Sequence, residues 1–297
     1  MNLELYKAFF YTVKYGTISK ASEHMYITQP AVSRSIQQLE DSLKCSLFFR
    51  TSKGVRLTPE GELLYKYIEQ AFNFISAGES KINEVINLLA GEVRIGVSDT
   101  ICKYYLIPYL KLFRTLHPAV KIQVICPTTP MIIQLLKTGK IDFGIINLPY
   151  SDDSLNFQDI LKVQDCFVAG EKYKDLSRQM QHLHEIVKQP MILLEKSSNS
   201  RSHIDSYFKA NNLSVIPDLE LGNIDLLTQF AKYDFGIACV IKNFIQEELD
   251  NQNLYEIKPI EKIPPRSIGV TWLKNVPLSS AAKVLISNLD YLDNSEI

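Results

Sequence analysis

The sequence predicts a mixed fold, in which an all-α winged helix-turn-helix head and a long linker helix precede a larger α/β domain. Three observations predict it. Apolar residues recur at helical spacing through the first 45 residues, one apolar seam runs from Thr58 to Leu89, and short apolar strands alternate with helical stretches after Gly91. The chain has 297 residues, 46% of them hydrophobic, which is enough for two or three domains with substantial cores.

The charge of the chain is unevenly distributed. The formal net charge is -1, so the whole chain has no electrostatic signature of a nucleic-acid or membrane binder. Residues 1–58 differ, because they hold eight Lys and Arg residues against four Asp and Glu residues, a net charge of +4. The acidic excess therefore lies in the remainder of the chain.

The amino terminus and the cysteines indicate the compartment. The first residues, MNLELYKAFF, include an early glutamate and no long apolar run, so they match neither a secretory signal nor a lipidation motif. No stretch approaches the ~18 apolar residues of a spanning helix, so we expect a cytoplasmic protein without a membrane partner. The cysteines are odd in number and form no CxxC, which favours buried reduced thiols over disulfides or zinc. A redox sensor would need a resolving partner that their spacing does not supply. They are Cys45, Cys102, Cys126, Cys166 and Cys239.

The first 43 residues predict three helices. A stripe from Leu3 to Val13 ends at Gly16, a residue that suits a helix stop. Thr17 is placed to cap a short second helix, Ile18 to Met25, and Thr28 to cap a third that runs to about Leu43. The second and third helices, joined by a short turn, give a helix-turn-helix, whose later helix can enter a major groove.

The polar face of the third helix carries side chains that can read bases. Gln can bond adenine, Arg can bond guanine, and a helix amino end attracts phosphate. The alternative is an ordinary solvated face, which competes poorly because no acidic residue occurs there before Glu40. Residues 47–57 then predict two strands around a Ser-Lys-Gly turn, a basic wing that can meet phosphates or the minor groove. The candidate DNA-binding residues are Thr28, Gln29, Pro30, Ser33, Arg34, Gln37, Arg50, Lys53 and Arg56.

The stretch from Thr58 to Leu89 predicts one long helix with a pairing seam. Thr58 can cap it, Pro59 suits its first position, and Gly91 can close its far end. Apolar residues alternate in steps of four and three, so we expect a second copy of the helix to pair with it. An amphipathic helix within one globular core is the alternative. The seam residues are Leu64, Ile68, Ala71, Ile75, Ile82 and Val85.

After Gly91 the pattern is that of α/β architecture. The predicted strands are Val93 to Val97, Ile122 to Ile125, Asp142 to Ile146, Phe167-Val168, Met191 to Leu194, Leu219 to Leu221, Ile237 to Val240 and Ile268 to Trp272. Helices are predicted at Leu106 to His117, Met131 to Lys137 and Ser279 to Leu292.

Hydroxyl-rich segments follow several of these strands. In open sheets, ligands bind at the carboxyl ends of strands, so these segments are candidates for holding a small polar effector. Each residue could instead be an ordinary helix cap. Asp99 would oppose an anion unless Lys103, Lys196 or Arg201 offset its charge. The candidate effector-binding residues are Ser98, Asp99, Thr100, Thr128, Thr129, Asn147, Ser198, Ser200 and Arg201.

The sequence contains no recognisable motif for catalysis, cofactor binding or metal binding. It contains no GxGxxG, GxxxxGK, GxSxG or HExxH motif, so we expect neither catalytic residues nor a cofactor. His182 and His184 would point apart on a helix, which favours surface residues over a metal site. Two alternatives remain: an enzyme or metabolite-binding protein whose head mediates only protein contacts, and a secreted solute-binding protein. The second conflicts with the amino terminus.

Residues 1–60 resemble the winged helix-turn-helix of LysR-type transcriptional regulators. The matching segments are Phe9-Phe10, Gly16 to Ser22, Thr28 to Ile36, Gln38-Leu39-Glu40, Leu47-Phe48 and Leu57 to Gly61. The resemblance implies that Gln29, Pro30, Ser33 and Arg34 face promoter DNA. It also implies that Lys53 lies near the minor groove, where the family usually has arginine; lysine keeps the charge but loses the flat fork.

The resemblance extends more loosely over the rest of the chain. It implies a DNA-binding domain at 1–58, a linker and dimerisation helix at 59–90, and an effector-binding domain of periplasmic-binding-protein type at 91–297. That domain would have subdomains at 91–162 with 266–297 and at 163–265. The resemblance also implies a bacterial regulator that forms homodimers and then tetramers, has RNA polymerase as a further partner, and responds to a small polar effector of unknown identity.

Overall fold

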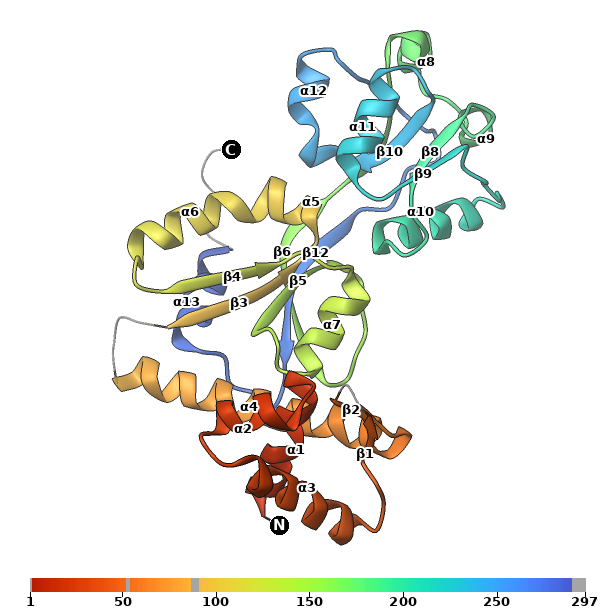
Figure 1. Ribbon diagram of the computed structural model, residues 1–297. Helices are drawn as coiled ribbons and strands as arrows, with labels where there is room; N and C mark the ends of the chain where they lie inside the picture. The colour runs from red at the N-terminus through yellow and green to blue at the C-terminus, as the bar shows by residue number, and fades with distance from the viewer. Residues whose placement is uncertain (1, 52–53, 87–90, 290–297) are drawn as a thin grey trace. The chain divides into compact units, whose positions relative to one another are not determined.

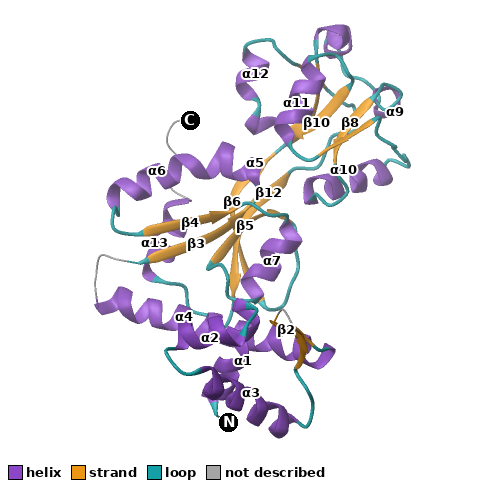
Figure 2. Ribbon diagram, in the orientation of Figure 1, coloured by secondary structure: helices purple, strands orange, loops and turns teal. Residues whose placement is uncertain are grey.

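The computed structural model describes residues 2–51, 54–86 and 91–289, and the chain divides into two compact units, residues 1–79 and 80–297 (Figures 1 and 2). The first unit holds the helical head and most of the long helix. The second holds two five-stranded sheets. No helix within the described ranges is long and apolar enough to cross a bilayer.

The first unit is a three-helix head followed by a two-stranded wing. Its elements are α1 (Leu3–Tyr15), α2 (Ile18–Met25), α3 (Gln29–Leu43), the antiparallel strands β1 (Phe48–Thr51) and β2 (Gly54–Leu57), and α4 (Pro59–Ile86). Gly16 ends α1 in the left-handed region with φ 76°, and the Thr17 hydroxyl accepts a hydrogen bond from the Lys20 amide at 3.2 Å. These two local signals fix α2 against α1, and the head closes over Phe9, Leu39 and Leu47.

The start of α3 differs from its prediction in one detail. Thr28 occupies the N-cap position, but its hydroxyl makes no capping hydrogen bond. Pro30, which has no amide hydrogen, lies in the first turn, so fewer donors need a cap there. At the other end of the helix, the Glu40 carboxylate accepts hydrogen bonds from the Leu47 and Phe48 amides, which ties α3 to the wing.

The long helix α4 begins as predicted and is covered on one side by its own head. The Thr58 hydroxyl accepts from the Gly61 amide at 3.0 Å and donates to the Ser46 carbonyl at 2.7 Å. Phe10 of α1 stacks on Phe72 of α4, with ring centroids 4.9 Å apart. The helix is described as far as Ile86, and the predicted end at Leu89 lies outside the described residues.

The first sheet of the second unit has the strand order β4-β3-β5-β12-β6, in which β4, β3 and β5 run parallel and β12 is antiparallel to its neighbours. Its strands are β3 (Glu92–Val97), β4 (Lys121–Ile125), β5 (Phe143–Leu148), β6 (Leu155–Val163) and β12 (Arg266–Leu273). The helical segments are α5 (Asp99–Ile101), the π-helix Cys102–Leu106, α6 (Ile107–Leu116), α7 (Thr129–Lys137) and α13 (Ser280–Leu289). Buried side chains of α6 and α13 pack on one face, while Ile132 of α7 packs over the other.

The second sheet has the order β11-β7-β10-β8-β9. Its strands are β7 (Asp165–Ala169), β8 (Met191–Leu194), β9 (Leu219–Leu221), β10 (Ile237–Ile241) and β11 (Tyr255–Ile257). The α-helices are α8 (Lys174–Ser177), α9 (Leu183–Ile186), α10 (Asn199–Ala210), α11 (Ile224–Lys232) and α12 (Gln246–Asp250). Helix α10 packs into one core cluster of this sheet and α11 into the other.

The chain crosses between the two sheets twice, at Gln164 and at residues 258–265. The crossings lie side by side, because Arg266 pairs in register with Val163 and the Gln164 amide donates to the Ile263 carbonyl at 3.0 Å. We call the part built on the first sheet subdomain I and the part built on the second sheet subdomain II. The predicted α/β architecture is confirmed, although strands β6 and β11 and helices α5, α8, α9, α10, α11 and α12 were missing from the prediction.

Gly61 gives a direct test of how the head packs on α4. A Cβ at Gly61 would meet the Leu47 carbonyl oxygen at 2.2 Å, whereas a Cβ at Gly78 of the same helix would meet nothing within 4 Å. We expect Gly61→Ala to destabilise the head by ~1–3 kcal/mol through overpacking. Gly78→Ala should stabilise α4 by ~0.5–1 kcal/mol. Calorimetric unfolding of both variants measures this, and equal shifts would contradict the packing.

Candidate functional sites

The outer face of α3 is accessible and lacks a free acidic side chain over its first three turns. Gln29, Pro30 and Arg34 are exposed and Ser33 is half-buried. Among the described residues Arg34 has no acidic partner, so its guanidinium is available for an external acceptor. Gln37 is exposed too, but its amide donates to the Asp41 carboxylate at 3.1 Å. The structure therefore collects the predicted base-reading side chains on one surface.

The wing and the turn add to this surface. Arg56 is exposed on β2. Lys53 and the side chain of Arg50 lie outside the described residues. Tyr26, which the sequence reasoning treated only as part of a turn, is 94% exposed and holds the left-handed conformation with φ 55° that ends α2. This tyrosine lies two residues before Thr28, so its exposed hydroxyl and ring edge are near the amino end of α3.

The second unit contains a cavity of about 220 Å³ between the carboxyl ends of the two sheets. Subdomain I contributes the segments after β3 and β4 and the end of β5, and subdomain II the segments after β8 and β9 and the end of β10. Eight of the nine predicted effector-binding residues line it: Ser98, Asp99, Thr100, Thr128, Thr129, Asn147, Ser198 and Ser200. Because the carboxyl ends of the strands of both sheets lie at the cavity, Ser98 and Ser200 both line it although they are 102 positions apart in the sequence.

Arg201 does not belong to this set, so its predicted role as an effector-binding residue is not supported. Its side chain is 3% exposed and forms ion pairs with Asp205 and Glu220, both at 2.8 Å, while it donates to the Leu194 carbonyl at 2.7 Å. The guanidinium thus joins α10 to the ends of β8 and β9. Sequence alone cannot show that a basic residue one position after a cavity residue points away from the cavity.

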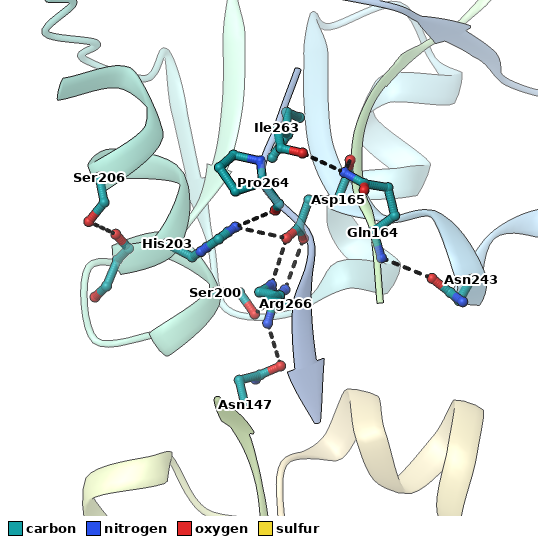
Figure 3. Close-up of polar contacts among 11 residues, drawn as sticks. Asn147, Gln164, Asp165, Ser200, His203, Ser206, Asn243, Ile263, Pro264 and Arg266 are labelled. Carbon is teal, nitrogen blue, oxygen red and sulfur yellow. Dashed lines mark hydrogen bonds and ion pairs between the residues drawn. The ribbon is translucent and has the colours of Figure 1, made fainter. Parts of the chain in front are cut away.

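A buried ion pair lies behind the cavity, where the chain crosses between the sheets (Figure 3). Arg266 and Asp165 begin the strands that follow the two crossings, and their side chains are 1% and 3% exposed, with Nε to Oδ2 2.6 Å apart. Arg266 also donates to the Asn147 amide oxygen at 2.5 Å and to the Ser200 hydroxyl at 3.1 Å. One guanidinium therefore orients a cavity side chain from each subdomain.

A second link joins the subdomains beside the cavity. Lys103 and Tyr104, in the π-helix, donate to the Asp225 carboxylate of α11 at 2.8 and 2.5 Å. Burial alone would raise the pKa of Asp225, but these two hydrogen bonds outweigh it, so the pKa is lowered and the carboxylate stays charged. Tyr104 also stacks on Phe244, with centroids 5.3 Å apart. Lys103 is thereby engaged with Asp225 rather than offsetting Asp99.

The cysteines are placed differently from their prediction. Cys166 and Cys239 are buried reduced thiols as expected, whereas Cys126 is exposed and lines the cavity. Cys102 lies against Cys126, although 24 positions separate them in the sequence. Burial first, and then the neighbouring Cys126 thiol, raises the pKa of Cys102 to about 11, so it stays protonated at neutral pH. Within the described ranges no group of three His, Cys, Asp or Glu residues could hold a metal ion.

Sequence reasoning missed several residues of the cavity wall. Glu195, Gly222, Ile224 and Ile241 line it as well, while Ser197 and Asn199, which also line it, belong to the hydroxyl-rich segment predicted after Leu194. Asn199 also donates to the Asn147 backbone carbonyl at 2.8 Å, a further link between the subdomains. Their positions in the sequence could have indicated them, because Glu195 and Gly222 directly follow strands of subdomain II and Ile241 ends one.

Comparison with known proteins places these sites in context. The family model described as "Bacterial regulatory helix-turn-helix protein, lysR family" matches residues 3–62, and "LysR substrate binding domain" matches residues 87–292. The transcriptional regulator GltR of Bacillus subtilis is 25% identical over 245 residues, which cover 82% of this chain and 81% of GltR.

Two solved structures show the same fold. Full-length CbnR complexed with its target DNA has a TM-score of 0.66 at 13% identity, covering 98% of this chain and 99% of CbnR. The effector-binding domain of QuiR in complex with shikimate has a TM-score of 0.60 at 20% identity, covering 68% of this chain and 96% of that domain. The family models together span both units, and the named relatives are regulators rather than enzymes. The chain therefore belongs to the LysR family of transcriptional regulators, DNA-binding proteins that carry a substrate-binding domain.

Proposed function

We propose that this regulator binds promoter DNA in the cytoplasm as a dimer, and that a small polar metabolite in the cavity between subdomains I and II changes how it binds or bends DNA. The proposed domains are 1–58 for DNA binding, 59–90 for dimerisation and 91–297 for the effector. The observation that carries this proposal is the shared cavity, where eight side chains singled out from sequence meet.

The surface of α3 supports sequence-specific reading of DNA. Its described face offers Gln29 and Arg34 without an acidic neighbour, and its amino end has a threonine hydroxyl that does not cap its own helix. Arginine reads guanine through two hydrogen bonds, and glutamine reads adenine in the same way. The residues proposed to contact bases or phosphates are Thr28, Gln29, Pro30, Ser33, Arg34, Gln37, Arg50, Lys53 and Arg56.

The exposed side of α4 supports pairing of two chains. Ile75 and Ile82 are 44% and 60% exposed, and Ala71 is exposed as well. A second copy of α4 would cover this seam, and a two-fold dimer would present two α3 helices to an interrupted dyad site. Leu64 is half-buried against its own head, and the side chain of Val85 lies outside the described residues. We propose tetramer formation through the effector domains, and contact with RNA polymerase, as further steps.

The links across the cavity support coupling between effector and DNA. The contacts that Asp225 and Asn199 make between the subdomains lie beside the cavity. A ligand that touches both subdomains therefore shifts the equilibrium between two arrangements of the subdomains. A ligand shifts such an equilibrium only by its differential affinity, and ~1–3 kcal/mol is typical of allosteric coupling. A few hydrogen bonds made in one arrangement and not in the other suffice.

Replacing Arg34 tests the reading of bases. We expect Arg34→Ala to weaken binding to the cognate site by ~1–3 kcal/mol and to relax its base preference. Arg56→Ala should weaken binding to all sequences evenly and reduce its salt dependence, because it removes a phosphate contact. Fluorescence anisotropy with fragments from the protein's own promoter region measures both. Arg114→Ala, an exposed arginine of α6, is the matched control. If the wild-type protein binds none of these fragments at low salt, the proposal that α3 binds promoter DNA is wrong.

Replacing Ile75 tests the pairing of α4. Ile75→Asp puts a charge into each side of the seam, so we expect pairing through α4 to be lost and the particle mass to fall to half or less of the wild-type mass, toward the 33.9 kDa of one chain. Light scattering after size exclusion measures the mass. Ser76→Asp introduces the same side chain at the next, exposed position and should leave assembly intact. An unchanged mass for Ile75→Asp would refute the pairing.

Replacing Thr100 and Thr128 tests the effector cavity. Neither hydroxyl has a hydrogen-bond partner in the described part of the chain, so Thr100→Val and Thr128→Val should leave folding and basal DNA binding unchanged. We expect both variants to lose the effector-dependent change in the DNA footprint, once a metabolite screen by thermal shift has identified the compound. Thr115→Val, on the exposed side of α6, is the control. Normal responses from both cavity variants would place the effector elsewhere.

A further inference from the structure

The cavity has an unusual charge composition for a site that would hold an anion. Among its described lining residues are two carboxylates, Asp99 and Glu195, and no Lys, Arg or His. Neither carboxylate has a basic partner in the described part of the chain. The basic residues nearest in sequence are engaged or lie elsewhere: Lys103 pairs with Asp225, Arg201 is enclosed, and Lys196 is not part of the wall.

The opposite chemistry comes from two helix amino ends. The first-turn amides of α10, and those of α7 apart from Pro130, which has no amide hydrogen, have no acceptor within their own helices. Thr128 and Ser198 occupy the two N-cap positions at the cavity, and neither side chain caps its helix. A helix amino end carries partial positive charge and donors that suit a carboxylate.

Two buried side chains add donors to this wall. Thr129 is 8% exposed and its hydroxyl has no partner among the described residues, although it borders the cavity. Asn147 is equally buried. Because Arg266 can only donate, it must face the Asn147 oxygen, which leaves the Asn147 NH₂ group without a partner and directed away from Arg266 (Figure 3). The buried side-chain atoms without a partner in the described part of the chain are the hydroxyls of Thr12 and Thr271, so the unpaired Thr129 hydroxyl and Asn147 NH₂ group are reached by solvent and can donate to a ligand in the cavity.

From these two features we infer that the effector is a zwitterion of the amino-acid class. Its carboxylate is held by the amino ends of α7 and α10 with Thr129 and Asn147, and its ammonium group by Asp99 and Glu195. A simple carboxylic acid would bring negative charge to a cavity with two uncompensated carboxylates. A neutral polyol can hydrogen-bond to these groups, but it carries no charge to compensate the carboxylates or the helix dipoles.

This assignment also explains how ligand binding favours contact between the subdomains. Asp99 follows β3 in subdomain I, and Glu195 follows β8 in subdomain II, where its carboxylate lies over Gly222. Without a cation, like charges on the two walls repel each other. An ammonium group between them reverses that interaction, so the charged group that identifies the ligand also draws the walls together.

The inference rests on the proposed effector role of the cavity, and titration calorimetry on the full-length protein tests it. The twenty common L-amino acids are screened first by thermal shift, with shikimate, benzoate and glycerol as the probes that lack an ammonium group. For each amino acid that binds, its 2-hydroxy acid and its decarboxylated amine are titrated as matched partners. We expect one or a few amino acids to bind at least tenfold more tightly than both partners.

Variants separate the two ends of the ligand. Asp99→Asn and Glu195→Gln should each weaken the amino acid at least tenfold and leave the 2-hydroxy acid unaffected or tighter. Thr129→Val should weaken both compounds. Asp153→Asn, an exposed acid outside the cavity, is the control. Equal binding of the 2-hydroxy acid or the amine, unchanged affinity in both acidic variants, or a panel in which no amino acid binds would each overturn the inference.

Failure of this inference and failure of the proposed function are distinguishable. If shikimate, benzoate or glycerol binds and alters the DNA footprint, the effector role of the cavity stands and the amino-acid class is wrong. If an amino acid binds with the expected variant pattern but leaves the footprint unchanged, the ligand class stands and the proposed coupling to DNA is wrong.

Discussion

The buried pair of Arg266 and Asp165 is the interaction on which the effector domain depends. Each residue begins the strand that follows a crossing between the sheets, and both are almost fully buried. Removing either partner would leave an uncompensated buried charge, which costs ~3–5 kcal/mol. Satisfied as it is, the pair holds the two crossings together and sets the direction of Asn147 and Ser200, so the shape of the cavity follows from it.

Around that pair, polar contacts and the stacking of Tyr104 on Phe244 join the two subdomains. The Asp225 carboxylate accepts from Lys103 and Tyr104, and Asn199 donates to the Asn147 carbonyl. Exposed ion pairs of this kind contribute little individually, ~0–1 kcal/mol, so a ligand with modest contacts to both walls can compete with them. A strong link at the crossings and weak links at the cavity mouth give one domain both a defined site and an adjustable opening.

In the head and α4, packing within one chain leaves part of the apolar surface of α4 uncovered. The aromatic stack of Phe10, Tyr65 and Phe72 covers one side of α4 from within the chain. Ile75 and Ile82 on the seam are exposed. We propose that a partner helix covers this apolar surface, which repeats at heptad spacing along α4.

Local patterns in the sequence determined the elements that depend on neighbouring residues. The glycine stop at Gly16, the caps at Thr17 and Thr58, and the period-two and period-3.6 apolar stripes each arise within a few residues of one another, so the helices of the head, the start of α4 and most strands could be predicted. Only the tertiary structure decided which polar groups remain available. Arg201 and Lys103 form ion pairs with acidic residues 19 and 122 positions away in the sequence. Cys102 lies against Cys126, and the orientation of Asn147 is set by its hydrogen bond from Arg266, which is distant in the sequence. The physical reason is that helix caps and the spacing of apolar residues depend on residues close together in the sequence. Whether a charged side chain has an ion-pair partner, or a donor an acceptor, depends instead on strand order and on where the chain crosses between the sheets.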